Sequence, residues 1–223
     1  DKLNLEFNGK LSLALKIFRN KYRKKFLHQL VSSQLDMDRL DYLSRDSFYT
    51  GVSEGVISSH RIIKMINVVK DELVVEEKGI YSVEKFIIAR RLMYWQVYLH
   101  KAVLSAEQLL IKILMRAKSL GQAGDELFCT PALGEFLHHK HTKKSFEKNV
   151  SLLDTFAQLD DTDIVASVKV WRNHPDKVLS TLCKNLLSRK LFKTRMQKVP
   201  FRKADMELAR KLVARTRRSP WAQ

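Results

Sequence analysis

The chain has 223 residues, 45% of them hydrophobic, so it can bury a real core and form one large domain or two small ones. Lysine and arginine outnumber acidic residues by 41 to 24, a formal charge of +17, which favours polyanionic partners such as nucleic acid, nucleotides or acidic lipid. Cys129 and Cys183 lie far apart, without a CxxC pair or a secretory leader, which argues against a disulfide framework and favours the cytoplasm. No uncharged apolar run approaches the ~20 residues of a membrane-spanning helix, so a membrane protein is not expected.

The first half of the chain is mostly helical by pattern. Only seven Gly and four Pro interrupt the sequence, and apolar residues recur at i, i+3 and i+4, which predicts an all-α protein. Helical patterns cover 11–18 and 22–46, stop at Gly51 and Gly55, and resume over 58–69. In 71–82, two short apolar runs flank Lys78-Gly79 and predict a small β-hairpin.

The second half contains the longest predicted element. Residues 83–120 lack both Gly and Pro, which predicts one long helix, straight or bent, of about ten turns. A polar linker over 121–126 precedes four shorter helical patterns, and a last helical segment lies near the C-terminus. We therefore expect regions at 1–120, 121–192 and 193–223.

The C-terminal region carries much of the positive charge. Between Lys184 and Arg218, thirteen Lys or Arg accompany two acidic residues, Asp205 and Glu207. Such a tail could bind nucleic acid. Two other interpretations are at least as good as nucleic-acid binding. The segment could be a solvated helix surface, or it could pack on acidic parts outside this chain.

The segment 32–47 concentrates charge on a predicted helix. At 100° per residue, one stripe about 100° wide holds Asp38, Arg39, Tyr42 and Asp46, while Met37, Leu40 and Leu43 point away. Such a stripe is usually an ordinary solvent-facing surface. Here Asp38 could ligate a metal, Arg39 could hold phosphate oxygens, and Asp46 could accept a hydrogen bond from a sugar hydroxyl.

A second stripe lies on the predicted long helix. Arg90, Tyr94, Tyr98 and Lys101 fall within about 80° of arc. Two cations and two rings would suit the phosphates and the sugar or base of a nucleotide. The alternative is a set of long side chains that cover the edge of a buried helix with their heads in water.

Three neighbouring histidines, His138, His139 and His141, do not predict a zinc site. Adjacent histidines on a helix point in different directions, and the sequence shows no Cys or acidic partner at ligand spacing. A solvated surface is expected. The chain also lacks a glycine-rich phosphate loop, GxSxG and HExxH.

The two stripes together carry a family resemblance. SSQLDMDRLDYLSRDSFYTGV, residues 32–52, strongly resembles the segment of HD-domain phosphohydrolases that carries the last metal-ligating aspartate, in the branch that includes deoxynucleoside triphosphate triphosphohydrolases. Arg90, followed by Tyr98 in YLHK, resembles their downstream nucleotide-contacting helix. The resemblance covers about 5–192 and implies an HD-type helical bundle, with 1–120 as the C-terminal part of the catalytic domain, 121–192 as a helical subdomain and 193–223 as a basic tail.

The resemblance also implies roles for individual residues. It makes Asp38 a ligand of a divalent metal (Mg, Mn, Ni, Fe or Zn), and it implies a homo-oligomer that hydrolyses its substrate to nucleoside and triphosphate. The implied substrate contacts are Arg39 and Arg90 with phosphate, Tyr42 and Asp46 with deoxyribose, Tyr98 beside the sugar and base, and Lys101 as a further basic contact.

One departure from the family concerns catalysis. The metal site of these enzymes begins with a histidine and a His-Asp pair upstream of the matched stretch, and this chain contains no His-Asp dipeptide. Since a catalytic metal typically needs three or more protein ligands, we expect this chain alone to be inactive. It is then the C-terminal portion of a longer enzyme or, alternatively, a catalytically inactive nucleotide- or nucleic-acid-binding regulatory protein.

Overall fold

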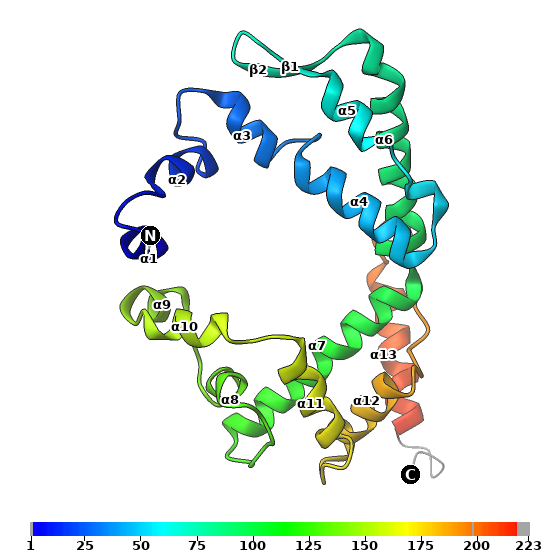
Figure 1. Ribbon diagram of the computed structural model, residues 1–223. Coiled ribbons are helices and arrows are strands. Elements are labelled where there is room, and N and C mark those ends of the chain that lie inside the picture. The colour runs from blue at the N-terminus through cyan, green and yellow to red at the C-terminus, as the bar shows by residue number, and fades with distance from the viewer. Residues whose placement is uncertain (1, 198, 218–223) are drawn as a thin grey trace. The chain divides into compact units, whose positions relative to one another are not determined.

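The computed structural model describes residues 2–197 and 199–217, with side chains as far as residue 212 (Figure 1). Within these residues all regular secondary structure is helical, apart from one two-stranded antiparallel sheet. This confirms the prediction of an all-α protein with a small hairpin. The chain divides into two compact units, 1–100 and 101–223. None of the described helices combines the length and apolar composition that crossing a bilayer requires.

The first unit consists of short helices around two longer ones. Its elements are α1 (Lys2–Glu6), α2 (Ser12–Phe18), α3 (Lys25–Val31), α4 (Met37–Thr50), η1 (Ser53–Gly55), α5 (Ser59–Met65), β1 (Ile66–Val69), β2 (Glu72–Val75), η2 (Glu77–Gly79), α6 (Ile80–Met93) and η3 (Tyr94–Tyr98).

In the described residues of the second unit, all regular secondary structure is helical. Its elements are α7 (Lys101–Gln122), α8 (Pro131–His138), α9 (Lys143–Lys148), α10 (Ser151–Ala157), α11 (Asp161–Trp171), α12 (Lys177–Leu187) and α13 (Lys203–Arg217).

The hairpin lies earlier in the chain than predicted. β1 pairs with β2 through a two-residue turn, Lys70 and Asp71, whose φ angles of 49° and 66° are typical of a type I′ turn. The predicted turn at Lys78-Gly79 is wrong, because these residues form η2 and lead into α6. Gly79 is needed for close packing, since a Cβ there would lie 2.7 Å from Cγ1 of Val75.

The prediction of one helix over 83–120 is also wrong. α6 ends at Met93, and the π-helical turn η3 follows, in which the Leu99 N–H donates to the Tyr94 carbonyl at 2.8 Å. α7 then begins at Lys101, so the two units divide at this interruption, earlier than the boundary predicted at residue 120. A π turn needs neither Gly nor Pro, which is why the sequence did not reveal the break.

α4 has clear start and stop signals. Asp36 is its N-cap and accepts from the Arg39 N–H at 2.8 Å, and Gly51 ends it in the left-handed conformation with φ of 69°. Its apolar face packs against α5 and α6 in a core made of Leu40, Leu43, Ile57, Ile62, Phe86, Ala89 and Met93.

The second unit has its own core, around α7. Buried residues every four positions, from Leu109 through Ile113 to Ala117, face α8 and α12, and Figure 1 shows α12 beside α7. Trp171 of α11 is 1% exposed, and its indole N–H donates to the Phe128 carbonyl at 2.9 Å.

Candidate functional site

The start of α4 is held by an ion pair that the sequence reasoning missed. Asp36 is 2% exposed, accepts from the Ser33 N–H at 3.1 Å, and forms an ion pair with the Arg39 guanidinium. Nη1 of Arg39 makes this pair and also donates to the Ser33 carbonyl. Arg39, predicted to contact phosphate, is therefore fixed against the loop before α4. An acidic residue before a helical run is the N-cap signal that could have identified Asp36.

Three tyrosines form an aromatic cluster beside this helix. The Tyr98 ring lies edge-on to Tyr42 at 6.1 Å and to Tyr94 at 5.1 Å between centroids. The Tyr98 hydroxyl donates to Oδ2 of Asp46 at 2.6 Å. Tyr42 and Asp46 belong to α4, and Tyr94 and Tyr98 belong to η3. The contacts of this cluster therefore join residues of the two predicted stripes.

Two phenols of this cluster, those of Tyr42 and Tyr98, are held in their neutral form. Burial, together with the hydrogen bond to Asp46, raises the pKa of Tyr98 far above its usual range. Burial, with Tyr94 nearby, also raises the pKa of Tyr42. Both hydroxyls therefore remain hydrogen-bond donors at neutral pH.

Arg90 connects α6 to the same loop before α4. Its guanidinium carbon lies 5.8 Å from the centroid of the Tyr94 ring, and Nη1 donates to the Gln34 side-chain oxygen at 2.9 Å. The structure therefore brings Arg39, Tyr42, Asp46, Arg90 and Tyr98 into one continuous group. Gln34 was not predicted from the sequence, because a lone glutamine in a loop carries no distinctive pattern.

Two predicted site residues lie apart from this group of contacts. Asp38 is exposed in the first turn of α4, and Lys101 is exposed at the start of α7 in the second unit. Among the described residues, Asp38 belongs to no group of three His, Cys, Asp or Glu side chains close enough to share an ion. This chain's described residues therefore do not make a metal site at Asp38.

The expectation that the histidines lack an acidic partner is wrong. Glu135, His139 and His141 of the second unit offer ligand atoms that all lie within 4.8 Å of one another.

Comparisons with known proteins find similar sequences and structures. The family described as HD associated region matches residues 57–124, which include the hairpin, α6 and α7. A crystal structure titled as a phosphohydrolase, BT4208 from Bacteroides thetaiotaomicron, is 53% identical, covers 95% of this chain and superposes with a TM-score of 0.88. These matches support an HD phosphohydrolase family.

The curated sequence relatives are less similar to this chain than BT4208 is. The uncharacterized protein YwfO of Bacillus subtilis is 39% identical over 171 residues, 77% of this chain. A Dictyostelium discoideum protein named as a deoxynucleoside triphosphate triphosphohydrolase SAMHD1 homolog is 29% identical over 117 residues, which are 50% of this chain and 23% of that protein. The chain spans 37% of the length of YwfO and 54% of the BT4208 chain.

Proposed function

We propose that this chain is part of a metal-dependent HD-class phosphohydrolase that converts deoxynucleoside triphosphates to nucleoside and triphosphate. The observation that carries the proposal is the Tyr98 to Asp46 hydrogen bond, which joins two separately predicted stripes into one group. Similarity to a protein named as a deoxynucleoside triphosphate triphosphohydrolase homolog supports the substrate class.

The proposed contacts use groups that the structure has already oriented. Nη1 of Arg39 is held by Asp36 and Ser33, and the guanidinium carries three further N–H donors that can bind a phosphate. Arg90, held by Gln34 and the Tyr94 ring, is a second phosphate ligand. Oriented cations of this kind neutralise charge on a polyphosphate without a large entropy loss.

The sugar contacts follow from the tyrosine cluster. Asp46 accepts from Tyr98 through Oδ2, and a carboxylate has further lone pairs, so it can also accept from a deoxyribose hydroxyl. The rings of Tyr42 and Tyr98 would pack on the sugar and base. Lys101 is proposed as an additional phosphate contact.

The proposed metal role of Asp38 needs residues outside this chain. Asp38 would supply one ligand to a divalent ion (Mg, Mn, Ni, Fe or Zn), and a histidine and a His-Asp pair elsewhere in the whole protein would supply the others. The whole protein is proposed to be a cytoplasmic homo-oligomer. Residues 1–223 alone are proposed to be inactive.

The test uses the full-length protein, supplied in turn with Mn²⁺, Mg²⁺ or Ni²⁺, and measures triphosphate release from each deoxynucleoside triphosphate. We expect Arg90→Ala to lower kcat/KM at least tenfold, since it removes a charge-assisted phosphate contact. The matched control is Arg91→Ala, which removes an exposed neighbouring arginine that stacks on Trp95 at 5.3 Å.

Two results would overturn this proposal. One is the absence of hydrolysis of every nucleotide by metal-loaded full-length protein. The other is an equal loss of activity in the Arg90 and Arg91 variants. Turnover by residues 1–223 alone would separately contradict the proposed need for outside metal ligands.

A second candidate function is nucleic-acid binding by the C-terminal basic region. Among the described residues between 184 and 212, nine cations are exposed: Lys184, Arg189, Lys190, Lys193, Arg195, Arg202, Lys203, Arg210 and Lys211. Within that range Arg202 pairs with Asp205 at 3.0 Å. The remaining cations favour a polyanion as partner.

A further inference from the structure

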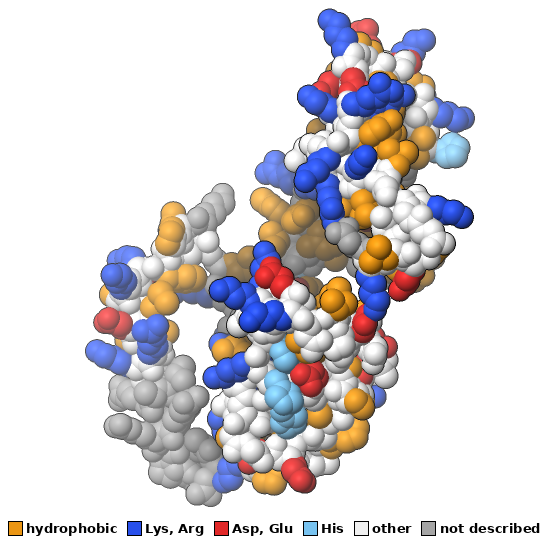
Figure 2. All heavy atoms as spheres, turned by 90° about the vertical axis from the view of Figure 1, so that its left-hand side faces the viewer, with side chains coloured by type: hydrophobic (Ala, Val, Ile, Leu, Met, Phe, Trp, Pro, Cys, Tyr) orange, Lys and Arg blue, Asp and Glu red, His pale blue; other side chains and the backbone are white. Residues whose placement is uncertain are grey.

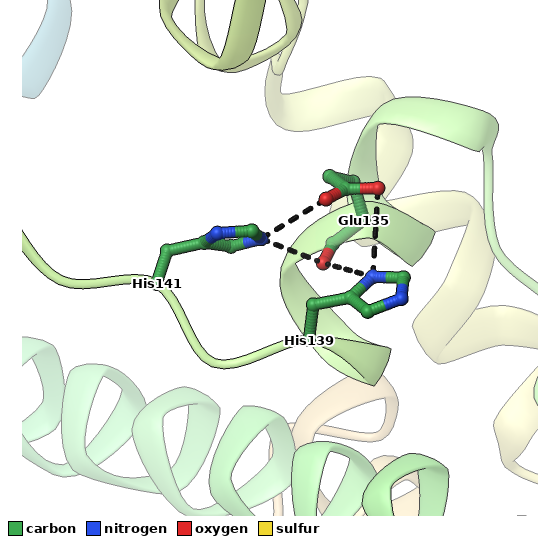
Figure 3. Close-up of side chains that lie close together, drawn as sticks. All are labelled: Glu135, His139 and His141. Atoms are coloured by element: carbon green, nitrogen blue, oxygen red, sulfur yellow. Dashed lines mark hydrogen bonds and ion pairs between the residues drawn. The ribbon is translucent and has the colours of Figure 1, made fainter. Parts of the chain in front are cut away.

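A histidine and glutamate cluster stands at the end of α8, apart from the residues used above. Figure 2 shows histidine side chains gathered in one place on the surface of the second unit, and Figure 3 shows His139 and His141 turned toward Glu135. Nε2 of His141 lies 3.1 Å from Oε1 of Glu135, and Nδ1 of His139 lies 3.5 Å from Oε2. For metal to ligand bonds of ~2.0–2.1 Å, two ligands of a tetrahedral zinc ion lie about 3.3 Å apart. Both distances are close to that spacing.

The backbone explains how these side chains meet. α8 ends at His138, and His139 is extended, with φ of −108° and ψ of 154°. The chain leaves the helix at His139, and the rings of His139 and His141 both reach the Glu135 carboxylate. Glu135 lies one helical turn before His139, on the same face. The sequence reasoning failed here because it treated the histidines as helical.

His138 does not belong to the cluster. Its Nδ1 lies 3.2 Å from the Gly121 carbonyl, so this ring is turned toward the end of α7. Geometry therefore selects His139 and His141 from the run 138–141, which contains three histidines, and brings them to Glu135.

Two phenylalanine rings pack against His141 and hold its ring in place. The His141 side chain is only 14% exposed, and its ring lies edge-on to Phe136 at 5.4 Å and to Phe146 at 6.2 Å. Glu135 is 34% exposed and His139 63%, so the cluster opens to solvent on the His139 side. His141 is thus a partly buried ligand that ring contacts hold in place, and the exposed His139 side lets an ion reach the site.

We propose that Glu135, His139 and His141 bind a zinc ion, with a fourth position left for water or another ligand. Two imidazoles and one carboxylate match the donor preference of zinc. The carboxylate contributes negative charge, which favours a cation at this position. The bound ion would clamp the end of α8 to the loop that leads into α9. This site is independent of the proposed phosphohydrolase function.

The same groups could also be held without a metal. Nδ1 of His139 and Nε2 of His141 lie 3.3 and 3.4 Å from the Glu135 carbonyl oxygen, within hydrogen-bond range. In that arrangement the rings donate to a helix end and need no ion. The two alternatives differ in one measurable property, which is the stoichiometric uptake of zinc.

The test is calorimetric titration of Zn²⁺ into chelator-treated chain, comparing the unchanged protein with Glu135→Gln, His139→Ala and His141→Ala. We expect one equivalent bound per chain, and at least a tenfold weaker affinity in each variant, because each removes one of three ligands. A rise in Tm with Zn²⁺ should accompany binding in the unchanged chain and shrink in the variants.

The control is His60→Ala, which removes an exposed histidine from α5 in the first unit and should leave zinc binding unchanged. Circular dichroism confirms that each variant is folded, and Glu135→Gln keeps a side chain of the same size. The visible spectrum of Co²⁺-loaded chain should show four-coordinate metal. The proposal would be overturned by the absence of stoichiometric uptake in the unchanged chain, or by ligand variants that bind Zn²⁺ as tightly as the unchanged chain does.

Discussion

Asp36 carries the least exposed charge at the start of α4, and it has two roles there. Its carboxylate accepts from the backbone of Ser33 and Arg39, which caps the helix, and it pairs with the Arg39 guanidinium. The Arg39 side chain is only 27% exposed. The ion pair therefore both orients a proposed phosphate ligand and stabilises the fold. A cap and a positioning group are therefore combined in one side chain.

We expect Asp36→Ala to lower the free energy of unfolding by about 2 kcal/mol, since it removes a cap and leaves a partly buried guanidinium without its anion. Asp36→Asn, which can still cap, should cost less. Urea denaturation measures both values. The control is Asp41→Ala, which breaks the exposed Asp41 to Arg45 pair and should change stability by less than about 0.5 kcal/mol. Equal losses at positions 36 and 41 would contradict this account.

At the scale of elements, α12 is joined to α7 by a bidentate ion pair. Arg116 of α7 donates from Nε and Nη2 to the two carboxylate oxygens of Asp176 at 3.1 and 2.6 Å. Asp176 is also the N-cap of α12 and accepts from the Leu179 N–H at 2.7 Å. One carboxylate thus caps one helix and ties it to another.

This carboxylate should make stability depend on acid pH. The hydrogen bond from Arg116, followed by that from Leu179, lowers the pKa of Asp176 below its usual value of 3.8. Its contribution is therefore complete above that value and is lost as the pH falls through the lower folded pKa. We expect Asp176→Asn to weaken the acid dependence of urea denaturation midpoints. The control is Asp205→Asn, which changes the exposed pair with Arg202. Identical pH profiles of the urea midpoint for the unchanged chain and Asp176→Asn would contradict the prediction.

The elements show where sequence patterns suffice. The amphipathic run of α4, its cap and its terminal Gly51 are local signals, so its helical core and the polar stripe could be predicted. The turn of the hairpin could not, because Gly79 looks like a turn residue but is required by its contact with Val75. The break after Met93 has no local signal, since a widened helical turn contains ordinary residues.

At the scale of the molecule, the sequence could place residues on a face but not fix their partners. Helical geometry grouped Tyr42 with Asp46, and Arg90 with Tyr98, but only the packing of α4 against α6 joins the two pairs. The ion pair of Arg39 could not be predicted from helical geometry, because its partner, Asp36, lies outside the predicted stripe. The zinc candidate was missed for a related reason, because the helix ends at His138 and the chain beyond it brings His141 to Glu135, while His138 turns toward Gly121.

The charge of the whole chain leads to a last prediction, for the basic C-terminal region. If its exposed cations bind nucleic acid, affinity for a single-stranded oligonucleotide should fall steeply with salt, because each neutralised phosphate releases counterions. Arg210→Ala with Lys211→Ala removes two exposed cations of α13 and should lower the slope of log K against log salt by about 1.4, at ~0.7 per phosphate contact. Lys24→Ala with Lys25→Ala removes the same charge from the first unit and should leave the slope unchanged. If both double variants change the slope equally, binding reflects the net charge of +17 and not a site in the C-terminal region.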